Sequence, residues 1–167
     1  ADKLSLGTNL IERAGCFGCH TIERYQDKRR IGPDLNRIAS KVSKDWAYLW
    51  IRDPKSFRHN SWMPKFFELE NNSSDVDVSR TNQELHTIVH YLFNNSEDFP
   101  LNDVPRWGDV TRGEDLVNSL GCLGCHRIEN EPTDEVTSLQ SLRRDHGPNL
   151  VGVGAKTSRE WIYNWLK

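Results

Sequence analysis

The chain lacks any apolar run that approaches the roughly 18 residues a helix needs to cross a bilayer, although it is 167 residues long. Its first residues also lack the positively charged segment and the apolar stretch that make up a secretory signal peptide. Neither sign of charge dominates, because 22 Lys and Arg stand against 24 Asp and Glu. We expect no membrane span within this chain and no nucleic-acid partner.

Cysteine is scarce, and its four residues all lie in two copies of one pentapeptide. The copies are Cys16-Phe-Gly-Cys19-His20 and Cys122-Leu-Gly-Cys125-His126. Cys-x-x-Cys-His is the attachment signature of c-type haem. Each thiol can add across a haem vinyl group, while the histidine aims one ring nitrogen at the iron. The sequence therefore predicts two covalently bound haems c, with His20 and His126 as iron ligands.

Two other uses of the cysteines are disfavoured. Zinc ribbons place their cysteine pairs roughly 15 to 20 residues apart, whereas more than a hundred residues separate Cys19 from Cys122. A thioredoxin-like dithiol needs a neighbouring strand and helix, and no buried strand is predicted near Cys16 or Cys122. Haem attachment remains the preferred interpretation.

The two pentapeptides belong to a longer internal repeat. Residues 7–16 align with residues 113–122 at an offset of 106, and two later stretches align at an offset of 115. Those later pairs are 32–35 with 147–150, and 41–46 with 156–161. Such a long period indicates duplicated domains instead of a solenoid of short repeats. We predict one domain at 1–96, a proline-containing linker at 97–107 and a second domain at 108–167.

The spacing of apolar residues predicts an all-α fold with helices at matching places in the two domains. Residues 53–80 are predicted mainly as loop, and the last helix of the first domain is expected to follow them. The predicted helix starts are Ser5 or Thr8, Ser43, a capping box at Thr81, a second capping box at Thr111, and Thr157.

These features resemble the class I cytochrome c family over most of residues 4–95 and, less completely, over 110–167. In that family a methionine in the loop before the last helix is the second iron ligand. The resemblance implies this role for Met63, the single methionine in the sequence. It also implies that Gly7 and Ile11 mark the crossing of the first and last helices, through Ile88 and Tyr91.

The resemblance further implies how the proximal histidines are held and where the protein works. Pro33 and Pro148 match the proline whose carbonyl accepts a hydrogen bond from the histidine's other ring nitrogen. Haem c is attached outside the cytoplasm, so a periplasmic or other extracytoplasmic location is expected. A chain that begins at Ala1 then fits a mature product whose signal peptide has been removed.

Histidine and methionine on opposite faces of a haem leave no open coordination site. We therefore expect a one-electron carrier and no enzyme activity, in a dihaem cytochrome that works alone or within a larger complex subunit. The expected partners are redox proteins, such as a quinol-oxidising complex as donor and a terminal oxidase or reductase as acceptor.

The second domain departs from this pattern. At the offset of 115, the counterpart of Met63 would fall near position 178, so we expect the given sequence to be part of a longer protein. The alternative is an open sixth site on the second haem, as a dihaem peroxidase-like enzyme or a small-ligand sensor would need. The weaker candidates for iron ligation are His59, His86, His90 and His146.

Charged segments give a weaker indication about partners. The run Lys28-Arg-Arg30 follows the first haem motif and could steer an acidic redox partner. The matching loop of the second copy is acidic instead, with Glu129, Glu131, Asp134 and Glu135.

Overall fold

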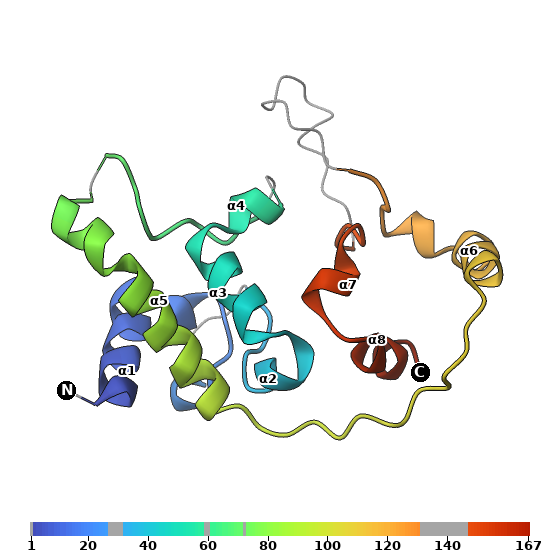
Figure 1. Ribbon diagram of the computed structural model, residues 1–167, viewed down its shortest axis with the longest axis horizontal. Coiled ribbons are helices and arrows are strands. Elements are labelled where there is room, and N and C mark those ends of the chain that lie inside the picture. Colours follow the sequence, from blue (N-terminus) through green and yellow to red (C-terminus); the bar gives the residue numbers. More distant parts are fainter. Residues whose placement is uncertain (1, 27–31, 59–60, 72, 131–146) are drawn as a thin grey trace.

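The structure is a computed structural model that describes residues 2–26, 32–58, 61–71, 73–130 and 147–167 (Figure 1). Its described part is helical and contains no strand, which confirms the predicted all-α class. The α-helices are α1 (Lys3–Ala14), α2 (Ile38–Lys41), α3 (Lys44–Arg52), α4 (Pro54–Phe57), α5 (Asp75–Asn94), α6 (Val110–Ser119), α7 (Val153–Lys156) and α8 (Arg159–Leu166). Within the described ranges, none of them is long and apolar enough to span a bilayer.

The core of the first half forms where α1 crosses α5, with α3 packed against the other side of α5. Ile11, Leu85 and Ile88 are almost fully buried there, and each such side chain contributes about 1.5–3 kcal/mol. Gly7 lies at the crossing, and a Cβ added to it would lie 2.8 Å from the Cβ of Tyr91. The expected crossing of the first and last helices is therefore present.

The start of α5 corrects the prediction for Thr81. A capping box forms at Ser74, whose Oγ accepts from the backbone N–H of Asp77 while the Asp77 carboxylate accepts from the backbone N–H of Ser74. Thr81 lies inside the helix, and its hydroxyl donates to the carbonyl of Asp77. Two aspartates in the first turn favour the earlier start because they face the positive end of the helix dipole. With α4 also helical, the prediction of mainly loop at 53–80 is wrong at both ends.

Two other predicted starts are also too late. Helix α1 is capped by Asp2 instead of Ser5 or Thr8, and α6 is capped by Asp109 instead of Thr111. Aspartate is at least as good an N-cap as threonine, and each aspartate lies ahead of the residue that was predicted. The helices therefore begin at the first strong capping residue.

The third helix and its counterpart begin alike. The Ser43 hydroxyl accepts from the N–H of Trp46 at 3.1 Å, which confirms the predicted start. In the second half the Ser158 hydroxyl accepts from the N–H of Trp161 at 3.0 Å, so the cap is Ser158 and the prediction of Thr157 is wrong by one residue. The same local hydrogen bond thus positions both tryptophans.

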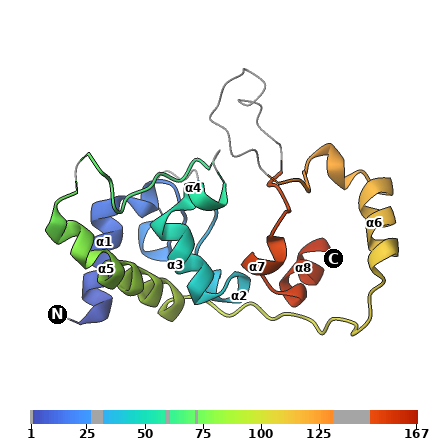
Figure 2. The same cartoon turned by 45° about the horizontal axis from the view of Figure 1, so that its top comes forward.

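The two halves of the chain meet through equivalent residues. The Nζ of Lys41 lies 5.9 Å from the ring centroid of Trp161, and the Nζ of Lys156 lies 5.0 Å from that of Trp46. Both residues of each pair are related by the offset of 115, so each half offers the same lysine and tryptophan to the other, as in a two-fold interface. Figure 2 shows α7 and α8 between the first half and α6.

We call this contact between the halves, formed by Lys41 with Trp161 and by Lys156 with Trp46, the seam. Positive charge is concentrated there. Burial, with smaller contributions from Arg58 and Lys41, lowers the pKa of Lys156 to about 8. The faces of the tryptophan rings offset part of that desolvation because they attract cations. Arg58 also donates to the carbonyl of Asn149 at 3.0 Å, which ties the end of α4 to the second half.

Candidate haem-binding sites

Each Cys-x-x-Cys-His motif forms the same tight turn after a helix. Gly15 and Gly121 adopt left-handed conformations, with φ of 68° and 79°, which turn the chain out of α1 and α6. The short 3₁₀ helices Cys16–Gly18 and Cys122–Gly124 follow. In both motifs the backbone N–H of the histidine donates to the backbone carbonyl of the first cysteine. The local sequence therefore determines how the two cysteines and the histidine are arranged in space.

The thiols are free in both motifs. Burial raises the pKa of the Cys16 thiol to about 11, so this cysteine stays protonated at neutral pH. A redox-active dithiol instead requires a lowered thiol pKa. The environment of Cys16 thus argues against thioredoxin-like chemistry.

Both histidine rings are oriented by the carbonyl of a proline. The Nδ1 of His20 lies 2.8 Å from the oxygen of Pro33, and the Nδ1 of His126 lies 2.7 Å from that of Pro148. When Nδ1 donates to a carbonyl, Nε2 carries the free lone pair that a metal requires. Burial also lowers the pKa of His20, which favours the neutral, ligating form of its ring.

A glycine before each proline lets the backbone pass across the histidine ring. A Cβ added to Gly32 would overlap the ring of His20, and one added to Gly147 would overlap the ring of His126. Gly147 also donates its N–H to the carbonyl of Cys125 at 2.9 Å. The donor set at each motif, two free thiols and an oriented imidazole, fits a covalently attached haem.

Met63 lies in the loop between α4 and α5, half-buried and packed against the core of the first half. Its sulfur accepts a hydrogen bond from the indole Nε1–H of Trp50, with 3.0 Å between nitrogen and sulfur. Its backbone N–H donates to the hydroxyl of Ser61 at 3.2 Å. The sequence did not predict the contact with Trp50, which lies near the C-terminal end of α3.

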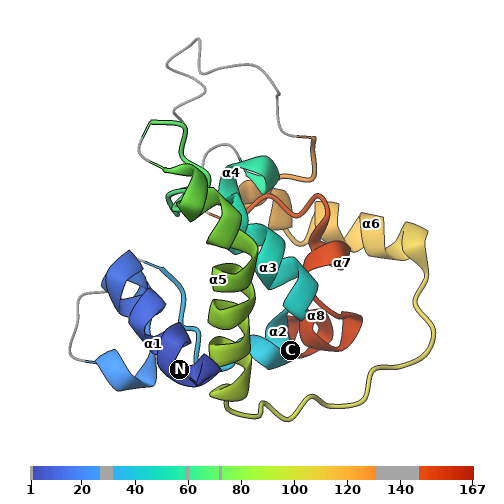
Figure 3. The same ribbon diagram turned by 60° about the vertical axis from the view of Figure 1, so that its left-hand side comes forward.

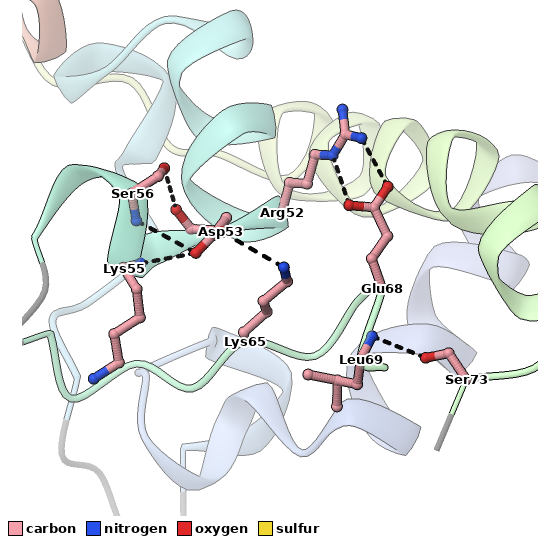
Figure 4. Close-up of polar contacts among 8 residues, drawn as sticks. All are labelled: Arg52, Asp53, Lys55, Ser56, Lys65, Glu68, Leu69 and Ser73. Atoms are coloured by element: carbon pink, nitrogen blue, oxygen red, sulfur yellow. Dashed lines mark hydrogen bonds and ion pairs between the residues drawn. The ribbon is translucent and has the colours of Figure 1, made fainter. Parts of the chain in front are cut away.

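Two ion pairs anchor the loop just after Met63 to the end of α3 (Figure 4). The guanidinium of Arg52 donates two hydrogen bonds to the carboxylate of Glu68, at 2.7 and 3.2 Å. Lys65 lies 3.5 Å from the carboxylate of Asp53, and Asp53 also caps α4. These partly exposed pairs each contribute about 0.2–1 kcal/mol, but together they hold the segment 65–68 against the helix that carries Trp50.

The other histidines do not form a metal site in the described part of the chain. The ring of His86 packs against Tyr48, with 4.7 Å between centroids. His90 lines a surface pocket together with both of these residues. No group of three potential ligands occurs among the described residues. His59, His146, Lys28–Arg30 and the acidic residues Glu131, Asp134 and Glu135 lie outside the described residues.

Residues 24–105 match a protein-family model described as "Cytochrome C oxidase, mono-heme subunit/FixO". The matched stretch contains Met63, Trp50 and the whole of α5. It begins four residues after His20 and ends before Cys122, so neither Cys-x-x-Cys-His motif lies within it. No curated protein matches the chain.

Proposed function

We propose that the protein is a dihaem electron carrier in a terminal oxidase complex. The match of residues 24–105 to the mono-heme oxidase-subunit family supports a c-type cytochrome domain and the link to an oxidase. The proposal of a second haem rests on one observation: the same local arrangement occurs in both halves of the chain. Each half has a Cys-x-x-Cys turn, a histidine held by a proline carbonyl, and a glycine that makes room for the ring. The proposal comprises tandem domains at 1–96 and 108–167, the linker at 97–107, and an extracytoplasmic location.

At each site the cysteines and the histidine have different roles in holding the haem. Cys16 and Cys19, or Cys122 and Cys125, anchor the group covalently, and the oriented histidine supplies the proximal nitrogen. A bound haem c supplies reversible one-electron chemistry. In the first half the Met63 thioether would provide the sixth ligand, and soft sulfur would favour the ferrous state.

The seam supports electron exchange between the halves because it keeps them in contact. Arg58 bonds to Asn149, the residue next to Pro148, so the first half touches the loop that orients His126. The linker adds a further contact, since Asn102 and Asn164 share hydrogen bonds of 2.7–3.1 Å. An acceptor in a terminal oxidase would draw electrons from either half of such a unit.

A redox titration of the protein, followed by absorption, tests the carrier function. We expect two one-electron steps, one for each half, with the higher potential at the haem that Met63 ligates. A single one-electron step per chain would contradict the proposal.

Binding of carbon monoxide distinguishes an electron carrier from a peroxidase-like enzyme or a small-ligand sensor. The residues given include no second methionine that could serve as the sixth ligand of the second haem, and this is why the alternative of an open site is tested. For a pure carrier, the reduced full-length protein binds no carbon monoxide, and its spectrum is unchanged by the gas. Stoichiometric binding at one haem would instead support the peroxidase-like enzyme or the small-ligand sensor.

A further inference from the structure

The sulfur of Met63 accepts a hydrogen bond from the indole N–H of Trp50. A thioether sulfur is a weak acceptor with two lone pairs. One pair can accept from the indole while the other remains for a metal. The contact is therefore compatible with ligation by Met63.

Trp50 is itself held firmly. Its ring stacks on that of Trp46, with 5.0 Å between centroids and 17° between planes. Phe57 packs against both rings, at 5.9 Å from Trp50 and 5.7 Å from Trp46. Trp46 in turn lies under the ammonium group of Lys156 from the second half. The orientation of the Trp50 N–H is thus fixed by the rings of Trp46 and Phe57, and through Trp46 by the contact with Lys156.

The position of Trp50 along α3 adds to this constraint. Trp46 and Trp50 are four residues apart and so lie on one face of the helix. The helix ends at Arg52, whose ion pair with Glu68 draws the returning loop back toward it. The donor and the acceptor of the hydrogen bond are therefore both anchored to the same end of α3.

We propose that Trp50 is a positioning residue for the haem ligand Met63 and raises the reduction potential of the haem that Met63 ligates. The inference rests on the proposed function, because it takes Met63 as the sixth ligand. The N–H points the positive end of its dipole at the sulfur, and this favours the ferrous state, which carries one positive charge less than the ferric state. Hydrogen bonding to an axial ligand is one of the means by which a protein tunes haem.

The test compares the same substitution in two stacked rings. Trp50→Phe keeps an aromatic ring in the stack and removes the N–H, and Trp46→Phe is the matched control because its indole does not contact Met63. We expect Trp50→Phe to lower the equilibrium constant for reduction of that haem by roughly threefold or more. It also shifts the sulfur-to-iron charge-transfer band of the ferric protein. Trp46→Phe leaves both properties close to those of the wild type.

The outcomes separate this inference from the proposed function. If the wild type lacks a sulfur-to-iron band, Met63 is not the ligand, and both the ligation and the role of Trp50 are wrong. If the band is present but Trp50→Phe leaves the potential unchanged, or Trp46→Phe lowers it equally, only the role of Trp50 is wrong.

A measurement on the wild type tests the inference if Trp50→Phe does not fold. The indole N–H of Trp50 should exchange with solvent deuterium more slowly than that of Trp46, as followed by NMR of the ferrous protein, because only the former is hydrogen-bonded to sulfur. Equal exchange rates would overturn the inference.

Discussion

Replacing Met63 with histidine will lower the reduction potential of the first haem by roughly 0.1 V or more. Imidazole is a harder ligand than a thioether, so it stabilises the ferric state relative to the ferrous state. Because 59 mV is a tenfold change for one electron, the equilibrium constant for reduction falls more than tenfold. Redox titration of Met63→His beside the wild type measures the change.

The proposed second haem serves as the internal control for this variant. Its motif, Cys122 to His126, is distant in sequence from Met63 and is unaltered, so its redox step should keep its potential. The sulfur-to-iron band of the ferric first haem should disappear while that haem remains low-spin. An unchanged band and potential would show that Met63 is not an iron ligand.

Replacing Gly7 with valine will destabilise the first half by about 3 kcal/mol. The Cβ of any residue here would lie 2.8 Å from the Cβ of Tyr91 and 3.0 Å from the carbonyl oxygen of Thr87. Valine adds two further methyl groups at a point where α1 and α5 are already in contact. The helices must separate, and the buried contacts of Ile11 and Ile88 loosen with them. Thermal or denaturant unfolding of the haem-loaded protein measures the loss.

The repeat offers a matched control at Gly113, which aligns with Gly7 at the offset of 106. No atom of the described residues lies within 4 Å of the position of a Cβ added there. Gly113→Val should therefore change the stability of the 167-residue chain by no more than about 0.5 kcal/mol. Equal losses from both variants would show that the effect at Gly7 does not come from the crossing with α5 (Figure 3).

The two histidine–proline contacts were expected from the family resemblance. It implied the contacts of His20 with Pro33 and of His126 with Pro148, and the structure contains both hydrogen bonds. The capping predictions were less accurate, because Ser, Thr and Asp cap almost equally well, and the start of α5 was set by Ser74 instead of Thr81.

Contacts between distant segments could not be inferred from the sequence. Whether the N–H of Trp50 meets Met63 depends on the return path of the loop and on the ion pair between Arg52 and Glu68. The pairing of Lys41 and Lys156 with tryptophans likewise depends on how the halves dock. The repeat revealed that the residues were equivalent but not that they would contact each other.

The number of covalent haems per chain tests the dihaem proposal most directly. Mass spectrometry of the intact protein, produced in cells that attach haem c, should show the mass of the chain plus two haems. The double variant Cys122→Ala, Cys125→Ala should show one haem, and the variant that also lacks Cys16 and Cys19 should show none. A wild-type mass that corresponds to a single haem, unchanged by removal of Cys122 and Cys125, would contradict the proposal.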